Sequence, residues 1–187
     1  MRCLRANANV RLIANAPTNA LQLDHYYLTG FAMNRPSKVT LRRTLDILSL
    51  AMIVAYVIFV AARWDAFPSV VPSHFNALGQ PDAYGGRWVL LLEPAIALAL
   101  WALMAVTRRF PGAWNFPVRV TERNRARLYV IGEQMMTPLA PMVVFLLLYI
   151  GLMGVYELPV AVLYLVLATV LADIAVGIVR MVRERDA

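Results

Sequence analysis

The chain has 187 residues, of which 60% are hydrophobic and only 16% are charged, and its formal net charge is +7. This balance lies outside the range of ordinary soluble domains. A single cysteine, Cys3, excludes an internal disulfide and a cysteine metal cluster. The basic residues form no soluble module of their own, so we expect no direct nucleic-acid binding.

The first 32 residues contain no continuous apolar core, so they do not form a secretory signal peptide. We expect residues 1–39 to be a poorly ordered N-terminal tail and residues 40–187 to be a membrane domain. Met33 begins the basic stretch MNRPSKVTLRR, a common start for a small inner-membrane protein. Two interpretations stay open: translation starts at Met33, or residues 1–32 are a genuine cytosolic tail. His25, within that stretch, is assigned no role.

Four apolar blocks follow, and each is long enough to cross a bilayer. A helix needs about 20 apolar residues to span a hydrocarbon core of about 30 Å, and it satisfies its own backbone polar groups there. The blocks are apolar all round rather than amphipathic, which disfavours a soluble helical protein. The expected spans are Leu45–Ala62, Trp88–Val106, Thr137–Tyr156 and Leu158–Val179.

The distribution of basic residues predicts the orientation. With the N-terminus inside, 16 of the 18 lysines and arginines fall on the inner side, and only Arg63 and Arg87 fall outside. The positive-inside rule then places both termini and the Arg108–Gln134 loop in the cytoplasm of a bacterial inner-membrane protein. The Arg63–Arg87 loop faces outward.

The outer loop holds the residue types that could carry chemistry. His74 and Asp82 lie in a segment interrupted by proline and glycine, and Glu93 follows just inside the second span. Three interpretations of these residues stay open: ligands for a divalent cation, caps of turns in a structured loop, or contacts to an external peptide or small ligand. The His74–Asp82 spacing matches no standard metal pattern, so we expect no metal and no cofactor.

Carboxylates within or beside the spans are the remaining candidates. An acidic side chain inside the hydrocarbon usually marks function or a buried partner. For Glu93 the expected partners are Arg87, His74 or a backbone group freed by Pro94. Asp46 and Asp173 lie near the inner surface, and we expect interfacial arginines to pair with them, Arg42 and Arg43 in the case of Asp46.

The inner loop is predicted to have two parts. Residues 108–120 are extended, and a helix begins with Thr121 as its N-cap and runs along the membrane surface into the third span. Leu128, Ile131 and Met135 would line one face of that helix.

The segment Val71–Arg87, VPSHFNALGQPDAYGGR, resembles the signature of a bacterial integral-membrane domain of unknown function. That domain also forms the N-terminal part of SdpI-type immunity proteins, which protect a bacterium from a secreted peptide toxin. The resemblance covers about Thr40 to the C-terminus. It directs attention to His74, Asn76, Gly79, Asp82 and Arg87 as recognition residues, and to Asn115, Pro117, Thr121, Asn124 and Tyr129 as the motif of the cytosolic loop. Glu93, singled out as a carboxylate inside a span, is a further candidate recognition residue.

These observations predict an all-α membrane protein with four transmembrane helices and a structured extracytoplasmic loop. The sequence has no nucleophile–base pair, no phosphate-binding glycine loop and no HExxH motif, so we expect no catalysis. We expect a sensing, immunity or accessory role. The partners would be the lipid bilayer, an extracytoplasmic peptide or small ligand, and a cytosolic regulator. The alternative is a small oligomeric transporter, or a protein that handles protons or cations through Glu93 and Asp173.

Overall fold

The computed structural model describes residues 36–185. The chain divides into two units, Met1–Thr40 and Leu41–Ala187. Residues 1–35 of the expected N-terminal tail, which include His25 and the alternative start at Met33, lie outside the described residues, whereas residues 36–39 begin the first described helix. The elements in chain order are α2 (Pro36–Ala62), η1 (Trp64–Ala66), β1 (Val70–Phe75), β2 (Pro81–Gly86), η2 (Arg87–Leu91), α3 (Leu92–Thr107), η3 (Pro111–Ala113), α4 (Arg125–Tyr156) and α5 (Val160–Arg183).

Four helical segments are long and apolar enough to cross a membrane, as the four blocks predicted. They run over Val39–Ala62, Arg87–Thr107, Arg125–Tyr156 and Val160–Arg183. The third exceeds its prediction most, because the expected surface helix and the third span form one continuous helix of 32 residues. Pro138 and Pro141 lie inside this helix without ending it, which neighbouring helices make tolerable in membrane proteins.

The predicted N-cap of that helix was wrong. α4 begins at Arg125, with Asn124 rather than Thr121 at the N-cap position. The Thr121 amide donates to Asn124 Oδ1 at 2.8 Å, and the Asn124 amide donates to Thr121 Oγ1 at 3.3 Å. These reciprocal bonds hold residues 121–124 in a turn, so the helix starts three residues later than predicted.

The expectation of an all-α protein also needs correction, because the loop between α2 and α3 is a β-hairpin. β1 and β2 pair antiparallel from Val70 opposite Gly86 to Phe75 opposite Pro81, with an irregularity around His74. The connecting loop turns at Gly79, whose φ of +75° is a conformation that other residues rarely adopt. Asn76 Oδ1 accepts the amides of Leu78 and Gln80 at 2.9 and 3.0 Å, which fixes the turn locally.

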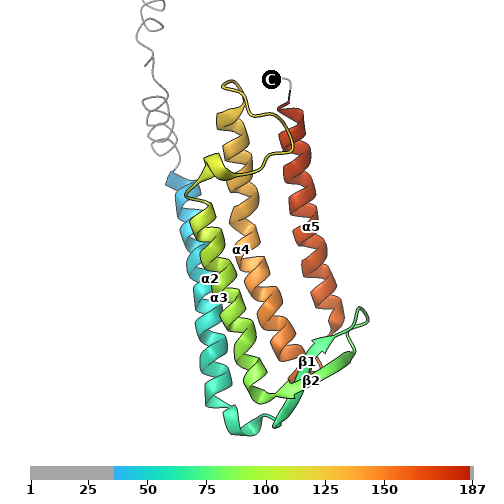
Figure 1. Cartoon of the computed structure of the whole chain (residues 1–187). Helices are drawn as coiled ribbons and strands as arrows, with labels where there is room; N and C mark the ends of the chain where they lie inside the picture. Colours follow the sequence, from blue (N-terminus) through green and yellow to red (C-terminus); the bar gives the residue numbers. More distant parts are fainter. Residues whose placement is uncertain (1–35, 186–187) are drawn as a thin grey trace, which may run out of the picture. The chain divides into compact units, whose positions relative to one another are not determined.

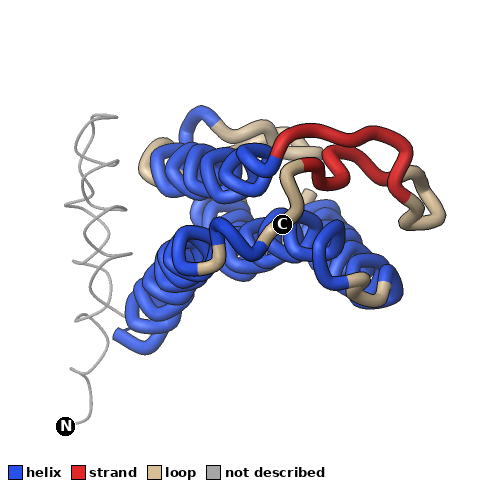
Figure 2. The backbone as a smooth tube through the Cα atoms, turned by 90° about the horizontal axis from the view of Figure 1, so that it is seen from below, coloured by secondary structure: helices blue, strands red, loops and turns tan. Residues whose placement is uncertain are grey.

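In the unit Leu41–Ala187, α4 packs against both α3 and α5 (Figure 1). The two strands lie across the helix ends at one end of the bundle, as the view along the helices shows (Figure 2). The main core lies toward that end. It brings Tyr56 and Val60 of α2 together with Ala97 of α3 and Leu148 of α4, and it includes Phe67 and Val71 beside the hairpin.

A second, smaller core lies at the opposite end. Leu128 and Ile131 of α4 pack with Met181 of α5, and Met135 lies against them. The face predicted for residues 128, 131 and 135 is therefore confirmed, and its partner is the last turn of α5.

Candidate functional site

The hairpin is fixed to the helix ends by contacts on both sides. At its base, the buried Phe67 ring packs against Phe59 of α2 and Tyr156 of α4, with centroids 6.2 and 6.4 Å apart. At its tip, the Tyr164 hydroxyl of α5 donates to the Ala77 carbonyl. The hairpin is thus held by three of the long helices.

Glycines allow the close approach. A Cβ at Gly79 would lie 2.6 Å from a Val160 methyl of α5, and one at Gly154 of α4 would lie 3.1 Å from both Pro72 and Phe75 of β1. Atoms do not approach a Cβ at such distances without displacement, so both positions favour glycine. Gly79, a predicted recognition residue, therefore has a packing role as well as a turn conformation.

His74 and Asp82, separated by eight residues, meet across the hairpin. Asp82 Oδ1 lies 2.5 Å from His74 Nδ1, and the two side chains are 68% (His74) and 43% (Asp82) exposed. Asn76 also forms a side-chain hydrogen bond, to Gln80 Oε1 at 3.3 Å. The pair is an ordered polar feature on an accessible surface, and Leu78 and Tyr84 expose apolar area on the same hairpin.

Arg87 does not pair with Glu93. Its Nη1 donates to the Trp64 carbonyl at 2.9 Å and lies 3.8 Å from Asp65 Oδ1, and its guanidinium lies over the Trp64 ring. Arg87 therefore links the start of the second span to Trp64 and Asp65, which directly follow the first span.

Glu93 lies in the first turn of α3, and neither expected side-chain partner reaches it. Its Oε2 atom is buried without a hydrogen-bond partner among the described residues. Two other helices meet it: a Cβ at Gly151 of α4 would lie 3.3 Å from the Glu93 carboxyl carbon and would overlap the Tyr56 hydroxyl of α2. Tyr56 is only 5% exposed, and its hydroxyl also has no partner in the described structure.

The two inner carboxylates differ from each other. Asp46 is paired with an arginine, but the partner is Arg108 at 2.6 Å rather than Arg42 or Arg43. Arg42 instead pairs with Glu133 of α4 at 3.0 Å. Asp173 was expected to pair with an arginine, yet its Oδ2 is buried and has no partner among residues 36–185.

The motif predicted for the cytosolic loop divides into structural and exposed residues. Asn124 is fully buried, and its Nδ2 donates to the carbonyls of Arg119 and Glu184 at 3.1 and 3.2 Å. Tyr129 stacks on Phe116 with ring centroids 5.8 Å apart. Asn115 and Pro117 are exposed. Asn124 thus joins the inner loop to the end of α5.

Several important residues were missed by sequence reasoning. Tyr56 and Gly151 lie within apolar spans where a lone tyrosine or glycine gives no signal. Trp114 covers Gly132, where a Cβ would lie 2.6 Å from the indole ring. An interfacial tryptophan and a helical glycine are individually common, so only packing reveals their relation.

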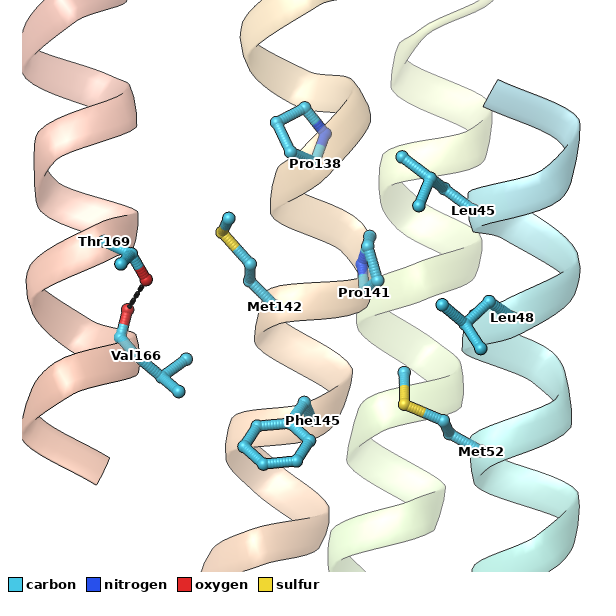
Figure 3. A pocket seen from close by; sticks show the side chains of 9 residues that line it. All are labelled: Leu45, Leu48, Met52, Pro138, Pro141, Met142, Phe145, Val166 and Thr169. Carbon is cyan, nitrogen blue, oxygen red and sulfur yellow. Dashed lines mark hydrogen bonds between the residues drawn. The ribbon is translucent and has the colours of Figure 1, made fainter. Parts of the chain in front are cut away.

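An apolar pocket of about 330 Å³ lies between α2, α4 and α5 (Figure 3). Met52, Pro141 and Phe145 are among its lining residues, and the Thr169 hydroxyl on its edge is satisfied by the Val166 carbonyl at 2.7 Å. The lining residues carry no charged group. It therefore adds nothing to the polar chemistry of the hairpin or of Glu93.

A divalent metal site built from His74, Asp82 and Glu93 is not assembled. Within residues 36–185, no group of three or more His, Cys, Asp and Glu side chains comes together. His74 and Asp82 meet on the hairpin, whereas Glu93 faces Tyr56 between the helices.

Four membrane-length helices define the class of this chain as a multi-pass membrane protein. A family model described as "Domain of unknown function (DUF1648)" matches residues 51–98, which include the whole hairpin and Glu93. An uncharacterized protein of Archaeoglobus fulgidus is 30% identical over 81 residues, covering 39% of this chain and 43% of that protein. The match thus spans less than half of that relative's length. No solved structure matches the chain.

The family match covers the segment Val71–Arg87 that carried the resemblance to a membrane domain of unknown function. The relation to SdpI-type immunity proteins stays a prediction.

Proposed function

We propose that this protein lies in the bacterial cytoplasmic membrane with its hairpin on the outer side and both termini in the cytoplasm. Of the 13 arginines after Thr40, only Arg63 and Arg87 belong to the hairpin end, and the other 11 lie at the opposite end (Figure 1). Cytoplasmic ends of membrane helices carry such an excess of basic residues.

The function that the geometry supports best is recognition, without catalysis, of an extracytoplasmic peptide or small ligand by the hairpin. The observation that carries the proposal is the exposed His74–Asp82 pair on a hairpin fixed to three long helices. An ordered site costs less conformational entropy on binding than a free loop does. Leu78 and Tyr84, 73% and 63% exposed, provide apolar contact area beside the pair.

A sensing, immunity or accessory role follows from such recognition. A partner bound on the outer face would act on helices that continue to the cytoplasmic side. There the loop ordered by Asn124 presents Asn115 and Pro117 to a cytosolic regulator.

Site-specific photocrosslinking in intact cells tests the recognition proposal. A photoreactive residue at Leu78 or Tyr84 should give a saturable crosslink to a peptide or small ligand. The same residue at Leu165, which is equally exposed on α5, should contact lipid only. Asp82→Ala should abolish the hairpin crosslink, whereas Ser73→Ala, at an exposed neighbouring position, should leave it intact. Equal crosslinking at all positions, or insensitivity to Asp82→Ala, would exclude hairpin recognition.

A second candidate is a small oligomeric transporter, or a protein that handles protons or cations through Glu93 and Asp173. The observation in its favour is that both carboxylates have a buried oxygen without a partner in the described chain. Unpaired carboxylates within membrane spans commonly mark ion pathways. Proton and sodium flux into vesicles that contain the purified protein, compared with Glu93→Gln and Asp173→Asn, tests this candidate.

A further inference from the structure

Three helices contribute to one small polar site below the hairpin. Tyr56 comes from α2, Glu93 from α3 and Gly151 from α4. The Tyr56 hydroxyl and Glu93 Oε2 are both buried and unpaired among the described residues. The absent side chain of Gly151 leaves the space into which both groups extend, because a Cβ there would overlap the hydroxyl and lie 3.3 Å from the Glu93 carboxyl carbon.

The surrounding charged and titratable groups are engaged elsewhere. On the hairpin side, Arg87 binds Trp64 and Asp65, and His74 binds Asp82. On α4, the Tyr149 hydroxyl donates to the Pro159 carbonyl, and the Tyr156 ring packs against Phe59 and Phe67. None of these contacts supplies a positive charge to Glu93. An ionised carboxylate at membrane depth without such a charge is expensive, so the site favours a cation.

We propose that Glu93 and Tyr56 bind a small monovalent cation, either a proton or Na⁺, between the carboxylate and the phenolic oxygen, which meet over Gly151. A carboxylate and a phenolic oxygen are hard oxygen donors, the type that such cations prefer. One carboxylate balances a single positive charge, and among residues 36–185 Glu93 belongs to no group of three or more His, Cys, Asp and Glu side chains that could hold a metal ion. The cation removes the cost of burying the negative charge.

The site lies directly beneath the hairpin. Gly154, one turn from Gly151 on the same face of α4, receives Pro72 and Phe75 of β1. The hairpin thus covers the end of the helix that forms one wall of the site. This inference extends the cation-handling candidate and rests on the same carboxylate, but it requires only binding, and it does not depend on hairpin recognition or on transport.

Labelling with dicyclohexylcarbodiimide tests the proposal on the full-length protein in bicelles. This apolar reagent adds to protonated carboxyl groups within a membrane, and mass spectrometry locates the adduct. We expect labelling of Glu93 that decreases as the pH rises. If labelling of Glu93 is lower in NaCl than in choline chloride at equal ionic strength, the bound cation is Na⁺. If labelling is identical in the two salts, the bound cation is the proton. Both results support a cation site.

Two variants assign the partners. Tyr56→Phe keeps the ring and removes only the hydroxyl. It should shift the proton or NaCl concentration that halves Glu93 labelling by about tenfold, which corresponds to about 1.4 kcal/mol. Gly151→Ala places a methyl group where the Tyr56 hydroxyl lies, so it displaces that hydroxyl and should reduce labelling by a similar factor. Ala140→Gly, at a buried α4 position away from the site, should leave the labelling profile unchanged.

The proposal is overturned if Glu93 stays unlabelled at every pH while the denatured protein is labelled, because the carboxylate is then permanently paired. It is also overturned if the Tyr56→Phe protein, shown to be folded by its thermal unfolding transition, has the same Glu93 labelling profile as the unsubstituted protein. Absence of ion flux with normal labelling would remove the transport candidate and leave the binding site standing.

Discussion

Arg108 Nη2 lies 2.6 Å from Asp46 Oδ1, although 62 residues separate them along the chain. The Arg108 side chain is only 4% exposed, so the pair is largely removed from water. It joins the end of α3 that lies away from the hairpin to the first span. Arg42 and Glu133 make a comparable link between α2 and α4.

Arg108→Ala is expected to destabilise the protein by about 3 kcal/mol, because breaking a buried pair leaves Asp46 without its counter-charge. Unfolding in bicelles measures the loss. Arg109→Ala, at the exposed neighbouring position, is the matched control and should change stability by less than about 0.5 kcal/mol. A double-mutant cycle with Asp46→Asn should show that the two stability losses are strongly coupled. Additive losses would show that Arg108 and Asp46 do not stabilise the fold through each other.

Asn124→Ala should cost about 1–3 kcal/mol, because it removes a fully buried amide that bonds backbone groups of Thr121, Arg119 and Glu184. The loss should appear as faster proteolysis of residues 108–124 and a lower unfolding midpoint. Asn115→Ala removes the same chemical group from an exposed position in the same loop. If the two variants had the same proteolysis rate and unfolding midpoint, the hydrogen bonds of Asn124 would not be what holds the loop to the end of α5.

Glu93→Leu is expected to raise the stability in lipid by about 1–3 kcal/mol, because it removes from the membrane a carboxyl group whose buried Oε2 has no partner among residues 36–185. Glu133→Leu provides the contrast, since it breaks the pair with Arg42 and should lower stability. Thermal unfolding of both variants in the same bicelles gives the comparison. A destabilised Glu93→Leu protein would show that the carboxyl group has a structural partner.

The proposed orientation predicts the activity of reporter fusions. A periplasm-active reporter fused after Ala77 should be active, and one fused after Arg125 should be inactive, because basic residues collect on the cytoplasmic side. The reverse pattern would place the hairpin in the cytoplasm and exclude recognition of an external ligand.

Part of the candidate site could be predicted from the sequence. Proline and glycine around His74 and Asp82 indicated a structured loop, and the two side chains do meet there. The two strands were not predicted, because each is short, contains a proline (Pro72 or Pro81) and has few β-branched residues. Their pairing depends on Phe67 and Val71 being buried against the helices, which a local pattern does not show.

The sequence by itself determined the four membrane-length helices and the uneven distribution of arginines. Both are local properties: hydrophobic length matches the thickness of a bilayer, and charge is counted loop by loop. Tertiary structure alone decided the partners. Asp46 pairs with Arg108, and Arg87 contacts Trp64 and Asp65. Glu93 lies beside Tyr56 over Gly151. Such choices depend on which helix faces meet, and side chains distant in the chain come together only when the helices pack.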